Sequence, residues 1–386
     1  MGRHDIDLMD PSVGDRLMAD GAADGLTPLE PLDVMGIQDF DDMLRAMSKT
    51  AFGGRNVGDA ADALEAMITD PDCSVVLTLS GAMTVAKMNL VITEMVERGW
   101  VQAIVSTGAL ITHGLVELAG MVHYKAEGAV DDEELYEKGY NRVYDTYEME
   151  KNLNDLAGIL RDVFDGLPRG ERFGSHELLA RIGAFLAKPG KRGILASAYR
   201  SGVPVYIPAF IDSELALDVA TWLVGRDLKE NPDLDVADAI ANMRSDFDPF
   251  RDLAHYVRII TQSPTLGIFT IGGGAPRNWA QQAPPFLDII NHALDVNQRL
   301  NRFKYGVRIC PEPAHFGGLS GCTYSEGVSW GKFVPQSEGG RFAEVMADAT
   351  MVWPLIVKGV MQRLEKKGVK PAAPKLDIPG CVPIRG

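Results

Sequence analysis

The chain has 386 residues, of which 46% are hydrophobic and 24% charged, as is usual for a globular protein. Its 53 acidic residues outnumber 38 lysines and arginines, so the formal net charge is −15. This balance argues against nucleic acid and anionic membranes as partners and favours small cationic ligands. No apolar run reaches the roughly 18 residues needed to span a bilayer, and the N-terminus lacks the pattern of a signal peptide. We therefore expect a cytoplasmic protein.

The cysteines and histidines show no metal-binding spacing. There is no CxxC pair, no HExxH motif and no local cluster of His and Cys, so the sequence predicts no catalytic metal. We expect four free, buried thiols of a reducing compartment: Cys73, Cys310, Cys322 and Cys381.

The two ends of the chain differ in composition from the middle. Residues 1–33 are rich in Asp, Gly and Pro, which predicts an N-terminal arm that packs on a neighbour or stays mobile. Residues 369–386 hold several prolines and are expected to form an irregular tail. The body between them, residues 34–368, has no internal repeat and is expected to form a single large domain. Helices are expected at 39–47 and 57–68, separated by a break at the Gly53-Gly54 pair.

Short apolar runs typical of strands buried on both faces follow one another along the body. The polar segment 120–150 is predicted to be an insertion or a solvated helix hairpin. The charged segment 227–250 is predicted to be an excursion on the surface. Helical patterns lie between the strands; they include one with Val85 and Met95 among its core positions, an amphipathic helix that uses Phe250 and Ile260, and a closing helix at 352–364. The strands are expected at 75–79, 103–107, 203–207, 267–271, 306–310 and 345–348.

This alternation predicts an α/β fold with a doubly wound, mostly parallel, Rossmann-like sheet and helices on both faces. Ligands of such sheets lie beyond the carboxyl ends of the strands. Small or polar residues stand at those ends: Ser80, Thr107, Asp212, Gly273 and Asp348. None of the turns is a GxGxxG motif, so each could also be a tight connection that binds nothing.

The most informative stretch runs from Gly321 to Lys332 (GCTYSEGVSWGK), because it combines a lysine, a carboxylate and an indole among small residues. A lysine amine is nucleophilic only when neutral, and burial beside an apolar ring lowers its pKa. Trp330 is placed to supply such a ring, and Glu326 to hold a cationic substrate. The alternative is an ordinary solvated lysine on a surface loop.

The run Glu326-Gly-Val-Ser-Trp-Gly-Lys332 resembles the active-site segment of the deoxyhypusine synthase family, in which this lysine forms a covalent imine with the substrate. The similarity extends over about residues 35–365. It implies an NAD-dependent homotetramer whose active sites are shared between two subunits. The resemblance places spermidine contacts on Asp218, Glu326, Trp330 and Lys332, although one extra residue follows Asp212. It places NAD contacts on Ser80, Gly81, Thr107, Gly108, Asp212, Gly273, Asp348 and Ala349.

The sequence also departs from the family pattern. Asn278 stands where the family has a substrate-contacting histidine, and it hydrogen-bonds without titrating near neutrality. Gly317-Gly-Leu319 replaces a segment with an amine-binding carboxylate. Thr112 and His113 replace two acidic residues; His113 is a candidate acid or base beside the substrate, or a structural hydrogen-bonding residue, and His315 is open to the same two interpretations.

These departures fit the deoxyhypusine synthase-like branch, some members of which form homospermidine. The first hypothesis is therefore NAD-dependent transfer of the 4-aminobutyl group of spermidine, through an imine on Lys332, to a small diamine such as putrescine. The second is a true deoxyhypusine synthase, which modifies a lysine of a translation factor precursor. The third is a non-catalytic sensor of NAD or polyamines, against which the retained Lys332 argues.

Overall fold

The structure is a computed structural model that describes residues 21–128, 131–167, 170–317 and 322–376. Most of the predicted N-terminal arm (1–20), the end of the predicted tail with Cys381 (377–386), and residues 318–321 lie outside the described residues. In the described part of the arm, Glu30 forms an ion pair of 2.8 Å with Lys49, which lies beyond the arm.

The centre of the molecule is a six-stranded, all-parallel sheet in the order β6-β2-β1-β7-β8-β9. When these six strands are numbered among themselves along the chain, their order is 3-2-1-4-5-6, which is that of dinucleotide-binding folds. The doubly wound parallel sheet is thus as predicted. The strands are β1 (Cys73–Leu79), β2 (Ala103–Ser106), β6 (Val205–Tyr206), β7 (Thr265–Ile271), β8 (Phe303–Ile309) and β9 (Arg341–Val345).

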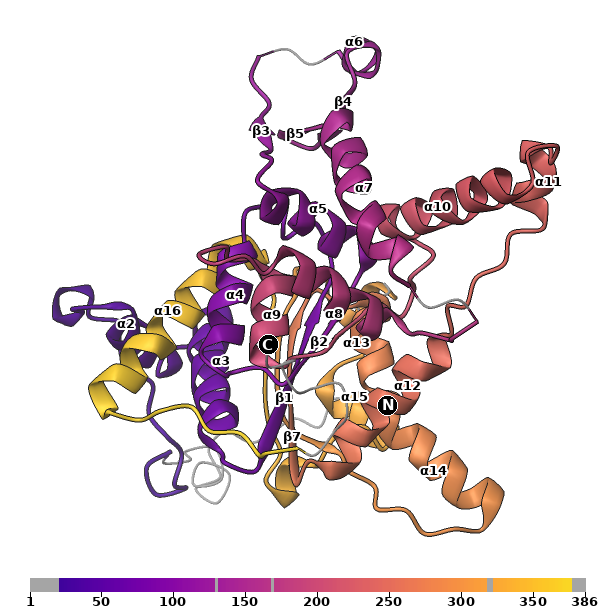
Figure 1. Cartoon of the computed structure of the whole chain (residues 1–386). Helices are drawn as coiled ribbons and strands as arrows, with labels where there is room; N and C mark the ends of the chain where they lie inside the picture. The colour runs from indigo at the N-terminus through magenta and orange to yellow at the C-terminus, as the bar shows by residue number, and fades with distance from the viewer. Residues whose placement is uncertain (1–20, 129–130, 168–169, 318–321, 377–386) are drawn as a thin grey trace, which may run out of the picture.

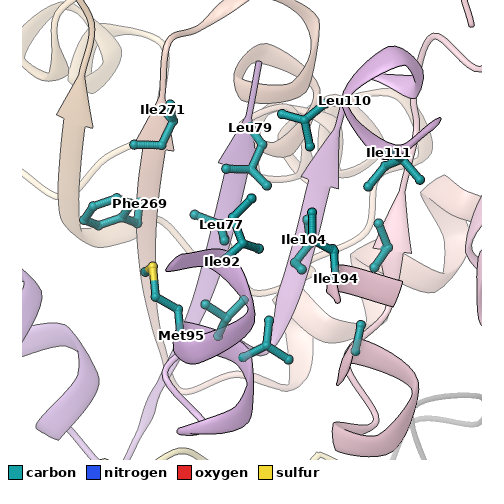
Figure 2. Packing of buried hydrophobic residues seen from close by; sticks show 14 of the residues in the cluster. Leu77, Leu79, Ile92, Met95, Ile104, Leu110, Ile111, Ile194, Phe269 and Ile271 are labelled. Carbon is teal, nitrogen blue, oxygen red and sulfur yellow. The ribbon is translucent and has the colours of Figure 1, made fainter. Parts of the chain in front are cut away.

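Helices cover both faces of the sheet, because each central strand has apolar side chains on both sides. In β1 every residue is buried. Its odd-numbered residues, such as Leu77 and Leu79, belong to the larger of two cores, and Val76 belongs to the smaller one. Figure 2 shows Leu77 and Leu79 on β1, with Phe269 and Ile271 on the strand to one side, Ile104 on the strand to the other, and Ile92 and Met95 on the helix in front.

The larger core is covered mainly by α3 (Phe52–Thr69), α4 (Asn89–Glu97), α5 (Gly108–Ala119), α7 (Glu150–Asp165), α8 (Ser175–Leu186), α9 (Ile194–Ser201) and α16 (Ala349–Lys367). The smaller core is covered by α12 (Pro249–Gln262), α13 (Gly274–Ala280), α14 (Ala283–Leu294) and α15 (Tyr324–Ser329). The remaining helical segments of the body are α2 (Phe40–Ser48) and the 3-10 turns η1 (Val34–Gly36), η2 (Ala314–Phe316) and η3 (Gln336–Glu338).

Two segments project from this body (Figure 1). One is a three-stranded antiparallel sheet in the order β3-β5-β4, so the insertion predicted at 120–150 is not a helix hairpin. The other is the pair α10 and α11, which occupies part of the predicted surface excursion. The bounds are β3 (Tyr124–Lys125), α6 (Asp132–Glu137), β4 (Tyr140–Val143), β5 (Thr146–Met149), α10 (Glu214–Glu230) and α11 (Val236–Ala241).

Three predicted element boundaries were wrong. Gly53 and Gly54 do not break a helix but lie in the first turn of α3, where the backbone N–H groups have no helical partner in any case. The helix predicted around Val85 begins only at Asn89, after a turn. The last strand is β9, which ends at Val345 where the prediction began, because this edge strand admits polar residues.

The buried face of α12 also differs from the predicted one. Ile260 is buried as expected, but Phe250 lies in the exposed first turn, and Asp252, His255 and Tyr256 are buried instead. Cys322 is only partly buried, whereas Cys73 and Cys310 are buried free thiols as predicted. None of the helices in the described ranges combines the length and the apolar character needed to cross a membrane.

A buried ion cluster joins the first and last helices of the body. Arg363 of α16 is fully buried, and its Nε donates to Asp41 Oδ1 of α2 at 2.6 Å. Its Nη1 donates to Asp62 and Glu65 of α3 at 2.5 and 3.3 Å. Burial alone would raise the pKa of Asp41, but the hydrogen bonds from Arg363 and Arg45 lower it. The side chains of the cluster are therefore ionised, and their ion pairs hold α2, α3 and α16 together.

Candidate active site

A cavity of about 460 Å³ lies at the carboxyl ends of the strands. The strand order reverses between β1 and β7, and ligands of doubly wound sheets bind at this reversal. The cavity is lined by residues that follow β1, β2, β6, β7 and β8, and its volume falls within the range of ligand sites. The lining includes five of the eight residues predicted to contact NAD: Ser80, Thr107, Gly108, Asp212 and Gly273.

Hydrogen bonds fix the floor of this cavity at the β1–β7 junction. The Oγ of Ser80 donates to the carbonyl of Ile271 at 3.1 Å and accepts from the backbone N–H of Gly273 at 3.0 Å. Gly272 has a φ of +77°, and a Cβ there would come within 2.3 Å of Ser80 Oγ. Glycine is therefore required at position 272, both for the left-handed backbone and for the close approach.

The N-terminus of α5 forms a second wall of the cavity. Thr107 is the N-cap, and its Oγ1 accepts from Leu110 N. A Cβ on Gly108 would lie 2.2 Å from Ser213 Cβ, so glycine lets the starts of α5 and α10 pack closely. The first backbone N–H groups of a helix have no internal partner and face anionic ligands favourably. This wall can therefore receive a phosphate.

The lysine segment is short and held firmly by its backbone. It comprises α15, whose N-terminus has a capping box between Thr323 and Glu326, and a turn at Gly331, where φ is +67°. The backbone N–H of Lys332 donates to the Gly327 carbonyl, and its own carbonyl accepts from Phe303 at the start of β8. The position of Lys332 is thus tied to the central sheet.

The amine of Lys332 lies in a largely shielded environment. The residue is 7% exposed, and Nζ donates to the Oδ1 of Asn278 at 3.3 Å. Burial lowers the pKa of Lys332, and the nearby positive charge of Arg277 lowers it further against the opposing effect of Cys322. Desolvation favours the neutral amine, which is the nucleophilic form. The burial predicted for this lysine is therefore present.

The lowered pKa of Lys332 gives a testable pH dependence. We expect its reductive alkylation by a small aldehyde and borohydride to rise with pH and to level off below the ordinary lysine value of 10.5. Exposed Lys358 on α16 is the control within the same chain. Peptide mass spectrometry at a series of pH values measures both sites, and an equal midpoint for the two lysines would show that Lys332 is not shielded.

Helix α13 connects the lysine to the cavity. Its first residues, Gly274, Ala275 and Pro276, line the cavity, and Asn278 reaches the amine. The carboxamide of Asn278, the residue that the resemblance places against the substrate, is exposed. Lys332 itself is not among the residues that line the cavity.

The other predicted substrate residues have different surroundings. Trp330 lies near the amine, with its ring centroid 5.9 Å from Nζ, but it is 67% exposed, so it does not supply the predicted apolar wall in a single chain. The exposed Glu326 accepts from the backbone N–H of Thr323 at 2.9 Å and so caps its own helix. Asp218 lies on α10, where burial and the charge of Glu214 raise its pKa to about 6.

Three predicted cofactor residues do not line the cavity. Gly81 is exposed with a φ of +76° in the turn after β1. Asp348 and Ala349 lie at the start of α16, where Asp348 accepts from the backbone N–H of Thr350 at 2.7 Å. They follow the edge strand β9, whereas the cavity lies at the ends of β1, β2, β6, β7 and β8.

His113 contacts Glu148 of β5 rather than the lysine segment, and His315 lies exposed in η2 against Phe316. Burial alone would lower the pKa of His113, but the hydrogen bond and charge of Glu148 raise it. Burial would likewise raise the pKa of Glu148, but His113 and His123 lower it to about 2. The sequence did not indicate this arrangement, because its members are separated by up to 35 residues.

A second, larger cavity of about 700 Å³ also escaped the sequence analysis. It lies among α8, α9 and α12, and its lining includes His176 and His255, whose rings stack at 4.2 Å. Asp252 accepts from His176 Nδ1 at 2.6 Å. The only signal in the sequence was a histidine on each of two helices.

The sheet order and the cavity define a doubly wound α/β protein with a ligand site at the topological switch point, and a shielded lysine beside it. The family model for deoxyhypusine synthase matches residues 42–360 of this chain. The chain therefore belongs to the deoxyhypusine synthase family, a family of transferases.

Individual relatives agree with this assignment. The chain is 30% identical to "Probable deoxyhypusine synthase 2" of Methanosarcina mazei, over 90% of this chain and 93% of the relative. It is 32% identical to "Deoxyhypusine synthase-like protein" of Chlorobaculum parvum, over 85% and 88%. A crystal structure assigned to an Entamoeba histolytica deoxyhypusine synthase superposes with a TM-score of 0.53 at 16% identity, covering 87% of this chain and 97% of that one, and supports the fold.

Proposed function

We propose that this protein is an NAD-dependent transferase that moves the 4-aminobutyl group of spermidine, through an imine on Lys332, to a small diamine such as putrescine. The observation that carries the proposal is the shielded amine of Lys332 with its lowered pKa, held by Asn278 on the helix that lines the cavity. A mere binding protein has no need of a neutral lysine at this place.

The residues of the cavity fit a dinucleotide. The N-terminus of α5 at Thr107 and Gly108 would receive the pyrophosphate, and the exposed carboxylate of Asp212 would accept from ribose hydroxyls. Gly272 and Gly273 keep the floor free of side chains where the ligand would approach the backbone. When bound, NAD would supply the oxidation of the donor amine and the later reduction of the product.

Lys332 performs the transfer between these two redox events. Its neutral amine adds to the carbon of the oxidised donor, and the C–N bond to the leaving diaminopropane breaks with a proton passing to that amine. The aminobutyl group is then held as an imine on Nζ. An acceptor amine adds to the same carbon and displaces Lys332, so one difficult transfer becomes two easier ones. Asn278 Oδ1 would accept from the amine and orient it.

Carboxylates near the site would hold the cationic ends of the substrate by charge-assisted hydrogen bonds. Glu326 is exposed and lies four residues before Trp330, about one helical turn, although one of its oxygens already caps α15. Asp218, with its raised pKa, would become fully ionised on meeting an ammonium group.

A second candidate function is deoxyhypusine synthesis, in which the acceptor is a lysine of a translation factor precursor. The name of the Methanosarcina mazei relative, a probable deoxyhypusine synthase, favours it. Asn278 favours the diamine acceptor, because a carboxamide at this position does not titrate near neutrality as a histidine does.

The site is also proposed to be completed by a second subunit, as part of a homotetramer. Within one chain Trp330 is two-thirds exposed, and Asp348 does not reach the cavity. Burial of Trp330 by a partner would supply the apolar wall that the single chain lacks. Light scattering of the purified protein measures the mass of the assembly.

The proposed function is tested by incubating the purified protein with spermidine and NAD, with and without putrescine, and trapping with borohydride. We expect a mass gain of one reduced aminobutyl group on Lys332, and homospermidine when putrescine is present. The adduct without homospermidine would point to a protein acceptor. No adduct with spermidine would contradict the proposed transfer and favour a sensor.

The exchange Asn278→His tests the acceptor preference. A histidine beside Lys332 restores a group that titrates near neutrality. We expect the ratio of homospermidine to protein-lysine product to fall by about tenfold, which corresponds to the free energy of one hydrogen bond to a charged group. Product analysis with both acceptors in one reaction measures the ratio. An unchanged ratio would remove Asn278 from acceptor selection.

A further inference from the structure

Three potential metal ligands converge where the small β3-β5-β4 sheet meets α5. They are His113 on α5, His123 in the segment that leads to β3, and Glu148 on β5. One donor atom from each lies within 4.8 Å of the donors of the other two. None of these residues takes part in the transfer steps derived above for Lys332.

Two of the three ligands are buried and have a donor atom without a hydrogen bond, whereas the side chain of His113 is 16% exposed. The side chains of His123 and Glu148 are 0% and 1% exposed. His123 Nε2 and Glu148 Oε1 face one another at 3.4 Å, and neither makes a hydrogen bond within the described part of the chain. Buried polar atoms are nearly always satisfied, so this pair calls for a further partner. A cation between them would satisfy both.

The remaining contacts orient the two imidazoles. His113 Nδ1 is hydrogen-bonded to Glu148 Oε2. On the far side of His123, Nδ1 lies 3.4 Å from Glu117 Oε1 and 2.9 Å from Lys87 Nζ. In zinc sites a carboxylate commonly accepts from the second nitrogen of a metal-binding histidine. Glu117 would take this role once His123 Nδ1 carries the proton, in place of the nearer contact with Lys87.

The surrounding charge also favours a cation. Glu148, Glu117 and Glu214 carry three negative charges near the two histidines, against one positive charge on Lys87. The Oε2 of Glu214 on α10 is a further buried oxygen that makes no hydrogen bond in the described ranges. A divalent ion would offset this negative charge.

We propose that His113, His123 and Glu148 bind a divalent ion of the zinc class, which fastens the β3-β5-β4 sheet to α5. Two imidazoles and one carboxylate suit zinc and leave a fourth tetrahedral position for water. Each histidine would bind the ion through the lone pair of one ring nitrogen and keep its proton on the other; a proton that occupies the binding nitrogen moves to the other ring nitrogen or leaves to solvent. Since α5 begins at the cavity, the ion would hold the helix that forms one of its walls.

The test uses the full chain purified without a histidine tag, stripped with a chelator and titrated with Zn²⁺ alone. We expect one tightly bound Zn²⁺ per chain by elemental analysis after gel filtration. X-ray absorption at the zinc edge should show two imidazoles with nitrogen at about 2.0–2.1 Å and no sulfur. This second measurement needs no variant, so it does not depend on the folding of a mutant.

Three variants assign the site. His123→Gln and Glu148→Gln should each weaken Zn²⁺ binding by about tenfold or more, and Glu117→Gln by about tenfold through the outer contact. The matched control is His292→Gln, because His292 is an exposed histidine on α14. Circular dichroism checks that each variant is folded.

Substoichiometric binding, sulfur at the zinc edge, or full binding by folded His123→Gln would overturn the proposal. The three residues would then form a hydrogen-bonded cluster alone. None of these results depends on aminobutyl transfer, so the proposed function can fail or stand independently.

Discussion

Replacing Lys332 by alanine is expected to abolish aminobutyl transfer while the chain still folds and binds NAD. The neutral amine is the only group proposed to form the covalent intermediate, and loss of a catalytic nucleophile lowers rates by about 10⁴-fold or more. The backbone hydrogen bonds of residue 332 do not depend on its side chain, so α15 and β8 should remain in place. Mass spectrometry after borohydride trapping and product analysis measure the loss.

Two variants serve as controls for this exchange. Lys332→Arg keeps a long cationic side chain, but a guanidinium does not become neutral and forms no imine, so it should be equally inactive. Lys358→Ala removes an exposed lysine of α16 and should keep full activity. Turnover by Lys332→Ala at the rate of the unmodified protein would exclude Lys332 from the mechanism.

The exchange Arg363→Ala is expected to give the largest loss of stability. It removes the fully buried guanidinium that joins α2, α3 and α16 and leaves Asp41 with Arg45 and Lys366 as its cationic partners among the described residues. Breaking a buried ion pair from one side costs about 3–5 kcal/mol, and the remaining partners of Asp41 favour the lower end. Urea unfolding measures the change in the free energy of unfolding.

The surrounding charges provide the comparison. Lys366→Ala removes a half-exposed lysine that also pairs with Asp41, and it should cost about 1 kcal/mol or less. The double exchange Asp41→Leu with Arg363→Met replaces the pair by apolar side chains and should recover most of the stability. An equal loss for Lys366→Ala and Arg363→Ala would show that burial of the guanidinium is unimportant.

The same ion cluster makes the stability of the fold depend on pH in the acidic range. The pKa of Asp41 is lowered in the folded chain, so its contribution to stability is present above the unfolded value of 3.8 and is lost as the pH falls through the folded value. Removal of Arg363 should make unfolding less sensitive to pH in this acidic range.

The sequence was sufficient to predict the central sheet, because β1 and β7 are continuous apolar runs followed by small residues. It was less informative for β9, an edge strand with exposed polar residues, and for the 120–150 insertion, whose short strands have little apolar content. Local composition does not specify how such segments pair.

The sequence predicted the cavity residues of the candidate site more completely than the surroundings of its lysine. The residues at the ends of β1, β2 and β7 follow from the rule that ligands bind at the carboxyl edge of a parallel sheet, and they line one cavity. The burial of Lys332 and its contact with Asn278 depend on tertiary packing between segments 54 residues apart. The convergence of His113, His123 and Glu148 was not predictable, because a helix, a connecting segment and a strand each supply one residue.

The shortness of helix α13 links the cavity to the amine of Lys332. It has seven residues, and Asn278 lies four residues after Gly274, which corresponds to a rise of about 6 Å along the axis. Such a short helix moves as one rigid unit. A ligand that displaces its first turn would therefore also move the Asn278 carboxamide that contacts the Lys332 amine. Occupancy of the cavity and the orientation of the Lys332 amine would thereby be coupled, and in the proposed reaction binding in the cavity would prepare the lysine before the second substrate arrives.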